Sequence, residues 1–249
     1  MLSSQRKKLI LELLARDKQV LSTELSQRFS ISEDSIRRDL RELAAEGLLQ
    51  RVHGGALPVS AANAPFETRK SVQMDSKRII AQKAVNLIQP GQVVIIDGGT
   101  TTGEMIKLLP GDLAFTAVTH SPAIAVGLAD YPLVEVIVIG GQLMKQSLVT
   151  VGASMLEGIR RINADLFFMG VTGVHQSAGF TTGNYEEACV KQALCARAAE
   201  TMVMASPEKL NSASPFTIGD LTLASTLLIN GTLDSEMSQL MQKRQITVI

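Results

Sequence analysis

Two patterns of hydrophobic positions divide the chain. Up to about residue 57, apolar side chains recur at helical spacing between charged residues, whereas from Lys77 onward short continuous apolar runs alternate with helical stretches. These runs are VVIID (93–97), LAFTAVT (113–119), VEVIVI (134–139), LFFMGV (166–171), TMVMA (201–205), LASTLLI (223–229) and ITVI (246–249). Continuous apolar strands with helices between them are typical of a parallel sheet covered on both faces. We therefore predict a small helical domain (1–57) followed by a larger α/β domain (73–249).

The stretch between these two regions has a different composition. Residues 58–72 read PVSAANAPFETRKSV, with small residues, two prolines and no apolar period. Such a composition is typical of a linker. We predict that residues 58–72 connect the two domains.

The first region predicts three short helices. Ser3 or Ser4 can cap a helix in which Leu9, Ile10, Leu13 and Leu14 form one apolar stripe. A second helix is expected to begin at Ser22 and to end near Phe29, and a third to begin near Glu33. The four residues Phe29–Ser32 then form the turn between them. Two helices joined by a turn of this length are typical of a helix-turn-helix motif.

The third predicted helix carries the residues that suggest a nucleic-acid contact. Ile36, Leu40 and Leu43 share one face and are expected to pack inward. Arg38 and Arg41 then point roughly 140–200° away, at about 100° per residue, and Arg37 flanks them. Arginine reads guanine with two hydrogen bonds and also binds phosphate. An outward row of arginines can also be merely a solvated face, so this helix alone does not settle the function.

A predicted wing follows the third helix. After Gly47 ends that helix, the sequence LLQRVHGGALP offers Gly54–Gly55 as a two-residue hairpin turn. The base-reading part of this motif usually lies at the start of its second helix, and the wing places Arg51 and His53 beside it. The residues predicted to contact double-stranded DNA are Ser22, Thr23, Ser32, Glu33, Ser35, Arg37, Arg38, Arg41, Arg51 and His53.

The run IIDGGTTTGEM (95–105) is the first candidate for a ligand site in the α/β domain. Asp97 ends a predicted strand, Gly98 and Gly99 let the backbone come close to a ligand, and Thr100–Thr102 supply hydroxyls and amides where a helix begins. The N-terminus of a helix attracts anions. The run lacks the Gly-Lys-Ser/Thr ending of a P-loop and the Gly-x-Gly-x-x-Gly of a dinucleotide site. We predict that it binds a small phosphorylated anion.

Other polar residues follow neighbouring predicted strands and should reach the same sheet edge, because ligands of parallel α/β sheets bind at the carboxyl ends of the strands. These candidates are Thr119, His120, Ser121, Gly140, Gly141, Thr181, Thr182, Tyr185, Glu186, Lys191 and Lys209.

The composition bears on the nucleic-acid surface, the cysteines and the cellular location that we expect. The formal net charge is zero, and residues 1–70 hold 12 Lys+Arg against 9 Asp+Glu, so any nucleic-acid surface must be a local patch. Cys189 and Cys195 lie roughly 240° apart on a predicted helix, and we expect free, buried thiols in a reducing cytoplasm. Because no apolar run approaches about 20 residues and no signal peptide pattern opens the chain, we expect a soluble, cytoplasmic protein. Neither a metal site nor a cofactor is predicted.

The sequence resembles a known protein family. SEDSIRRDLRELAAEGLLQRVHGGA (32–56) closely resembles the winged helix-turn-helix signature of the DeoR family of bacterial transcription regulators. IIDGGTTTGEM, the VIVIGG strand end and ADLFFMGVTGV (164–174) resemble the sensor domain of that family. The resemblance implies a sensor related in fold to ribose phosphate isomerase, a sugar-phosphate effector, and repression of a sugar-use operon.

The family pattern is not matched at two positions. The resemblance implies an effector-site asparagine where this chain has His120, and an acidic residue before Lys209 where this chain has Ser206. A lost carboxylate changes which sugar hydroxyls are recognised. The identity of the sugar therefore does not follow from the sequence.

A catalytic alternative has to be weighed against a regulator. Ribose phosphate isomerases carry acidic residues after the strand that resembles LFFMGV, but here the stretch MGVTGVHQSAGF contains no Asp or Glu. An isomerase needs a carboxylate base beside its substrate. Glu186 or Glu187 could supply one, although a glutamate at a helix start more often stabilises the helix dipole, and His175 is read as a loop residue. We predict binding without turnover; the alternative is an isomerase-like enzyme with a regulatory DNA-binding head.

Two further expectations concern partners. One small winged helix reads few base pairs, and paired half-sites fit a two-fold assembly, so we expect a homo-oligomer, either a dimer or a tetramer. An alternative for the first region is that it binds another protein rather than a DNA operator.

Overall fold

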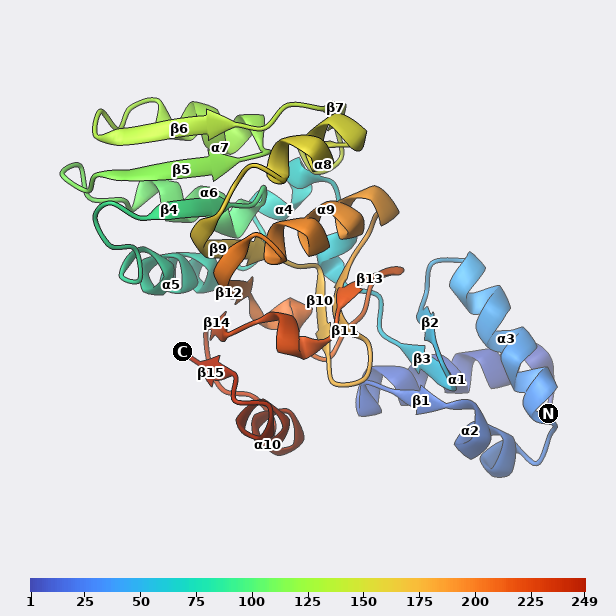
Figure 1. Cartoon of the computed structure of the whole chain (residues 1–249). Coiled ribbons are helices and arrows are strands. Elements are labelled where there is room, and N and C mark those ends of the chain that lie inside the picture. The colour runs from blue at the N-terminus through green and yellow to red at the C-terminus, as the bar shows by residue number, and fades with distance from the viewer.

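The seven apolar runs predicted as strands all enter one sheet in the computed structural model, which describes residues 1–60 and 62–249 and the backbone of Ala61. The strands are β4 (Val93–Ile96), β5 (Phe115–Thr119), β6 (Val134–Val138), β9 (Ala164–Gly170), β12 (Ala198–Ala205), β14 (Thr226–Ile229) and β15 (Thr247–Val248). Their order is β15-β14-β12-β9-β4-β5-β6, and all neighbours are parallel (Figure 1). The prediction of a parallel sheet is confirmed.

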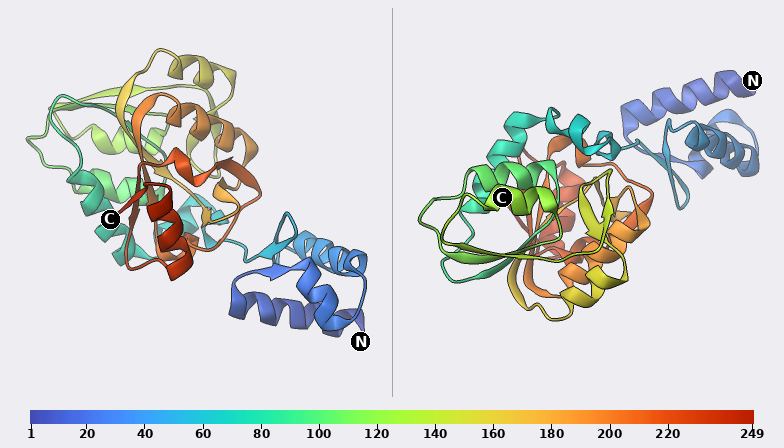
Figure 2. Two further views of the ribbon diagram at one scale, coloured as in Figure 1. Left: turned by 60° about the horizontal axis from the view of Figure 1, so that its bottom comes forward. Right: turned by 90° about the horizontal axis from the view of Figure 1, so that it is seen from above.

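Helices cover both faces of this sheet (Figures 1 and 2). One face carries α5 (Met74–Val85), α6 (Thr100–Lys107) and α7 (Pro122–Leu128), and the other carries α8 (Ala153–Ile159), α9 (Tyr185–Cys195) and α10 (Ser235–Lys243). Successive strand residues alternate between the two cores: Ile95 packs with α8 and α9, whereas Val94 and Ile96 pack with α5 and α6. Since both faces are buried, the strands read as continuous apolar runs.

Short antiparallel elements complete the α/β domain, and the hydrophobic pattern did not predict them. They are β7 (Gln142–Met144) with β8 (Val149–Val151), and β10 (Gly173–His175) with β11 (Gly179–Thr182) and β13 (Phe216–Gly219), together with the short helices η2 (Pro207–Lys209) and η3 (Leu221–Leu223). His175, expected in a loop, is in fact buried in β10, and its Nδ1 accepts a hydrogen bond from the Ser177 amide at 3.2 Å.

Residues 58–72, which we call the connecting segment, are folded onto the α/β domain. They contain η1 (Ala61–Asn63) and α4 (Phe66–Lys70), and Val59 forms a parallel bridge with Ala213. The Ser60 hydroxyl is buried and donates to the carbonyl of Thr172. The linker composition did not reveal these contacts, because they depend on residues more than a hundred positions away.

The first domain is a winged helix-turn-helix. It consists of α1 (Ser3–Asp17), β1 (Val20–Leu21), α2 (Ser22–Phe29), α3 (Glu33–Ala45), β2 (Gln50–Val52) and β3 (Gly55–Leu57), with sheet order β1-β3-β2. Ile36, Leu40 and Leu43 of α3 are buried with Ile10 and Leu14 of α1, as the helical spacing predicted.

A buried ion pair holds α1 against α3. Asp39 is 2% exposed and accepts from the Arg6 Nε at 2.5 Å, the Arg6 Nη2 at 3.1 Å and the Ser3 hydroxyl at 3.0 Å. The expected capping role of Ser3 or Ser4 is wrong, because α1 begins at Ser3 and its N-cap residue is Leu2. Ser3 instead donates to Asp39, and this contact fixes which face of α3 points outward.

The wing turn lies one residue earlier than predicted. Val52 pairs with Gly55, so the two turn residues are His53 and Gly54, and Gly55 begins β3. A Cβ atom at Gly55 would lie 2.0 Å from the carbonyl oxygen of Val20, because β1 crosses directly beside it. Gly55 is therefore required for the close approach of β1 rather than for the turn.

The two cysteines are free and half-buried rather than fully buried. Burial raises the pKa of the Cys195 thiol to about 11, so this thiol stays protonated at neutral pH.

Within the described part of the chain, the structure contains no helix with both the length and the apolar character needed to span a bilayer.

Gly55→Ala should destabilise the winged domain by about 1–3 kcal/mol, because the added methyl group forces β1 and β3 apart. Thermal unfolding followed by circular dichroism measures the loss. Gly111→Ala is the matched control, since its Cβ atom would meet nothing within 4 Å. Equal stability of the two variants would contradict the proposed close packing.

Candidate nucleic-acid interface and anion pocket

The outer face of α3 presents two arginines without partners. Arg38 and Arg41 are exposed, and neither makes an ion pair or side-chain hydrogen bond to any residue the structure describes. Arg37 differs, because its guanidinium lies 2.7 Å from Glu33 and 3.3 Å from Asp34 on the same helix. Arg38 and Arg41 are therefore the α3 cations available to an external anion.

The start of α3 and the wing flank this face. Ser32 caps α3 by accepting from the Ser35 amide, and its hydroxyl lies 3.0 Å from that of Ser35. Thr23, at the start of α2, is exposed, as are Arg51 and His53 on the wing. All of these side chains are accessible, and their contact with a duplex stays a prediction.

Ser22 does not join this surface. It is only 4% exposed, and its amide donates to the carbonyl of Gly54 at 2.7 Å. Ser22 thus ties the start of α2 to the wing, and its predicted contact with DNA is corrected to a structural role.

In the α/β domain, Asp97 gathers four elements at the carboxyl edge of the sheet. Its fully buried carboxylate accepts from the Gly98 amide and the Gly170 amide, both at 2.8 Å, and from the ammonium group of Lys191. Burial raises the pKa of Asp97, but Lys191 and His120 outweigh burial and hold that pKa at about 2. Asp97 is therefore an anion that positions the loop and does not itself line the pocket.

His120 completes this network. Its Nε2 lies 2.9 Å from the Asp97 Oδ1 and its Nδ1 lies 2.9 Å from the carbonyl oxygen of Thr150. Both neighbours are hydrogen-bond acceptors to which a ring N–H can donate. His120 thus holds Asp97 in place and is not among the residues that line the pocket.

The pocket itself, which we call the anion pocket, lies between the start of α6 and the connecting segment. It is lined by Arg69, Gly98, Gly99, Thr100, Thr101, Thr102, Gly170, Val171, Thr172, Glu187, Lys191 and Lys209. Thr101 is 3% exposed, and its Oγ1 is buried with no hydrogen-bond partner among the described residues. A buried hydroxyl without a partner is costly unless a ligand or water supplies one.

Three cations line the anion pocket, namely Arg69, Lys191 and Lys209, and Lys77 lies beside Arg69; we call these four the cation cluster. Burial, together with the nearby charges of Arg69, Lys77 and Lys191, lowers the pKa of Lys209 to about 8 against the opposing effect of Glu208. Burial likewise lowers the pKa of Arg69 and of Lys77. Lys191 is the exception, because Asp97 and Glu187 outweigh burial and raise its pKa. An anion in the pocket would relieve the mutual repulsion of these cations.

Several predicted residues support this edge without lining the anion pocket. The Thr119 hydroxyl donates to the Ile96 carbonyl at 2.7 Å, Ser121 caps α7, and the Thr181 hydroxyl accepts from the Ser214 amide at 2.9 Å. Gly140 and Gly141 lie between β6 and β7. None of them is among the residues that line the anion pocket.

Two predicted residues on α9 point elsewhere. Tyr185 is 62% exposed and packs edge-on against Phe216, and Glu186 is exposed. The pocket-facing carboxylate belongs to Glu187, whose Oε1 lies 3.3 Å from the Lys191 ammonium. Glu187 and Lys191 are four residues apart on α9 and share a face, a signal that the sequence contained.

The sequence interpretation also missed Arg69, Lys77 and Glu208. Arg69 and Lys77 flank the predicted end of the linker, where no motif marks them; the Lys77 ammonium donates to the Arg69 carbonyl at 2.5 Å. Ser206, read as the loss of a carboxylate, donates to Glu208 at 2.7 Å. A carboxylate is thus still present beside Lys209, two positions later than in the family pattern.

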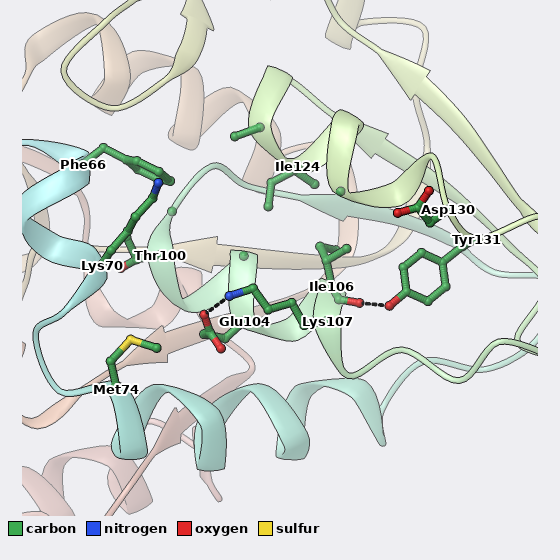
Figure 3. A pocket seen from close by; sticks show the side chains of 14 residues that line it. Phe66, Lys70, Met74, Thr100, Glu104, Ile106, Lys107, Ile124, Asp130 and Tyr131 are labelled. Carbon is green, nitrogen blue, oxygen red and sulfur yellow. Dashed lines mark hydrogen bonds and ion pairs between the residues drawn. The ribbon is translucent and has the colours of Figure 1, made fainter.

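A larger pocket, of about 690 Å³, lies along α6 and shares Gly99 and Thr100 with the anion pocket (Figure 3). Its Lys107 ammonium is 2.5 Å from Glu104, and the Tyr131 hydroxyl donates to the Ile106 carbonyl at 2.5 Å. Lys70, on its rim, pairs with Glu67 at 2.8 Å. Because these polar groups already have partners, this pocket is less suited to an anion than the smaller one.

The fold and the two sites define a class of protein: a winged helix-turn-helix DNA-binding domain attached to an α/β sensor domain. Residues 6–61 match the DeoR-like helix-turn-helix domain, and residues 72–231 match the DeoR C terminal sensor domain. The chain belongs to the DeoR family and is a DNA-binding transcriptional regulator. The family resemblance of the sequence is confirmed.

Named relatives cover almost the whole chain. The HTH-type transcriptional regulator GlpR of Haloferax volcanii is 35% identical, over 100% of this chain and 98% of its own length. The glycerol-3-phosphate regulon repressor of Escherichia coli K12 is 30% identical, over 90% of this chain and 89% of its own. A putative aga operon transcriptional repressor of Escherichia coli O157:H7 is 28% identical, over 99% of this chain and 93% of its own.

Solved structures are similar only at a distance. Ribose 5-phosphate isomerase A of Methanocaldococcus jannaschii has a TM-score of 0.41 at 18% identity, over 55% of this chain and 54% of its own. The eIF2B beta of Chaetomium thermophilum has a TM-score of 0.47 at 16% identity, over 69% of this chain and 54% of its own. At these scores neither structure says anything about activity.

Arg38→Ala should weaken binding to a duplex selected by the wild-type protein from a random library. If Arg38 contacts a base, we expect a loss of roughly 1–3 kcal/mol of binding free energy and relaxed specificity at one base-pair position. If it contacts a phosphate, the loss of affinity should be the same for all sequences. Arg37→Ala should cost less, because Glu33 and Asp34 already engage that side chain. Fluorescence anisotropy measures the affinities.

Arg160→Ala is the control: Arg160 is the C-cap residue of α8 and pairs with Glu157 at 2.9 Å, and the variant should bind DNA as the wild type does. Full DNA affinity after joint replacement of Arg37, Arg38 and Arg41 would instead favour a protein-binding role for the first domain.

Proposed function

We propose that this regulator is a repressor of a carbohydrate-related operon and that a phosphorylated sugar in the anion pocket controls its binding to DNA. Residues 1–57 would bind the operator, residues 73–249 would sense the effector, and residues 58–72 would connect them. Relatives named as repressors of the glycerol-3-phosphate regulon and of the aga operon support this class of target.

The observation that carries the proposal is the chemistry of the anion pocket. The unpartnered Thr101 hydroxyl, the N-terminus of α6 and the lowered pKa of Lys209 meet at one place. A helix N-terminus supplies free amides and a partial positive charge, and phosphate oxygens can accept from amide, hydroxyl and ammonium together. A phosphate group would satisfy all of these donors at once.

We propose binding without turnover. The two carboxylates nearest the pocket are engaged: Asp97 by Lys191, His120 and two backbone amides, and Glu187 by Lys191 and by the Ser147 hydroxyl at 3.0 Å. A general base needs a lone pair that faces the substrate's carbon-bound proton. The competing isomerase reading requires turnover of ribose 5-phosphate or fructose 6-phosphate at ordinary enzyme rates, which a coupled assay would detect.

We also propose that the functional unit is a cytoplasmic dimer or tetramer. One α3 helix reads only a few base pairs, and paired half-sites would supply the affinity that an operator needs. Light scattering of the free protein and of its DNA complex gives the stoichiometry; a monomer on DNA would contradict this.

The affinity for inorganic phosphate or a sugar phosphate should fall as the pH rises through about 8. Lys209 is protonated below its pKa of about 8 and binds the anion; above it, the neutral amine does not. The loss approaches about tenfold per pH unit, one proton being taken up on binding. Lys209→Arg keeps its charge and should flatten the profile, which calorimetry between pH 7 and 9 measures.

Thr101→Ala and Lys209→Ala should leave DNA binding intact and abolish its response to the effector. Both side chains line the anion pocket and are remote from α3. The measurement is DNA anisotropy titrated with glycerol 3-phosphate, ribose 5-phosphate and fructose 6-phosphate. Effector-driven release that survives in both variants would mean that the site lies elsewhere.

A further inference from the structure

Beyond Arg69 the anion pocket continues into a second compartment. Arg69, Thr172 and Glu187 line both spaces. The far side of the second compartment is formed by Asn63, Gln146, Ser147, Thr182 and Asn184. We call this space the hydroxyl compartment.

The two compartments differ in charge. Cations dominate the anion pocket, whereas the hydroxyl compartment is lined by neutral amides and hydroxyls together with the Glu187 carboxylate and Arg69. Thr182 is fully buried, and its Oγ1 has no hydrogen-bond partner among the described residues; the same holds for the Arg69 Nε. A sugar hydroxyl both donates and accepts, and such a lining satisfies both. The pair of compartments thus matches a ligand with one anionic end and one hydroxyl-bearing end.

The connecting segment forms one wall of this joint site. Asn63 accepts from the Ser214 hydroxyl at 2.9 Å, and the Phe66 amide donates to the Gln146 carbonyl at 3.1 Å. In the other direction the segment runs straight into the wing strand β3, which ends at Leu57 (Figure 1). The residues that close the site are therefore the residues that attach the DNA-binding domain.

Free space in the site is too small for a sugar. Each compartment has a cavity volume of about 20 Å³, which is room for about one water molecule. A phosphorylated sugar can enter only if a wall moves. The connecting segment is held mainly by side-chain hydrogen bonds and by single backbone hydrogen bonds. The opposite walls belong to the sheet edge and to α9, so the connecting segment is the wall that can move.

Building on the proposed function, we propose that the hydroxyl compartment binds the polyol end of a phosphorylated sugar and that this binding displaces the connecting segment. The phosphate anchors the ligand at α6, and the polyol end transmits its presence to the DNA-binding domain. Phosphate alone would open only the anion pocket, where Arg69 is the one lining residue of the segment, and would leave the contacts of the segment around the hydroxyl compartment in place. The ligand shifts the equilibrium because it fits the displaced arrangement better than the closed one.

The first test separates the two compartments by affinity. The probes are inorganic phosphate, glycerol 3-phosphate, ribose 5-phosphate and fructose 6-phosphate, measured by calorimetry and thermal stabilisation. Thr182→Val should weaken the tightest sugar phosphate by roughly three- to tenfold, the loss of one neutral hydrogen bond, and change the phosphate affinity less than twofold. Thr101→Val should weaken both. Thr226→Val, a buried strand threonine that lines neither compartment, is the control.

The second test follows release of DNA by anisotropy. Inorganic phosphate at saturation should leave the selected duplex bound, whereas the sugar phosphate should release it. Release by phosphate alone, or unchanged sugar-phosphate affinity in Thr182→Val, overturns the hydroxyl compartment while leaving the proposed function standing. If no probe binds at all, the proposed function fails and this inference fails with it.

Discussion

The buried carboxylate of Asp97 is the interaction on which the sensor depends. It joins the ends of β4 and β9, the residue after β5 and the helix α9 through Gly170, His120 and Lys191. A buried carboxylate is tolerated only when cations and amides satisfy it, and breaking such a pair leaves an uncompensated charge. By holding Lys191 and the Gly98 amide in place, Asp97 orients the start of α6, although it does not itself line the anion pocket.

The other cations near the anion pocket lie around the Asp97–Lys191 pair and do not bind Asp97 themselves. Lys209, Lys77 and Arg69 have pKa values lowered by burial, so the free protein holds positive charge that it cannot fully solvate. The anion that we propose for this pocket would relieve the repulsion between these cations, and that relief would contribute to its binding free energy. Because Arg69 belongs to the connecting segment, the same electrostatics act on the chain that leads to the DNA-binding domain.

In the first domain, a second buried ion pair helps to set the orientation of α3. Asp39 lies on the inner side of α3 and is held by Arg6, and together with the buried Ile36, Leu40 and Leu43 this pair sets which face of the helix points outward. Arg38 and Arg41 consequently face outward with no partner among the described residues, while Arg37 is engaged by its own helix. Two buried carboxylates, one in each domain, thus help to position the surfaces that we propose contact DNA and ligand.

The sequence by itself determined what depends on short-range pattern. Apolar period and turn spacing placed the seven parallel strands and the three helices of the first domain, and helical angle placed Arg38 and Arg41 outward. It also located Thr100–Thr102 at a helix start. Only the tertiary structure decided that Glu187 faces the pocket rather than Glu186, that Arg69 and Lys209 share a cluster, and that residues 58–72 are a wall rather than a free linker. Those contacts join positions far apart in the chain, where no periodicity or motif carries information about distance.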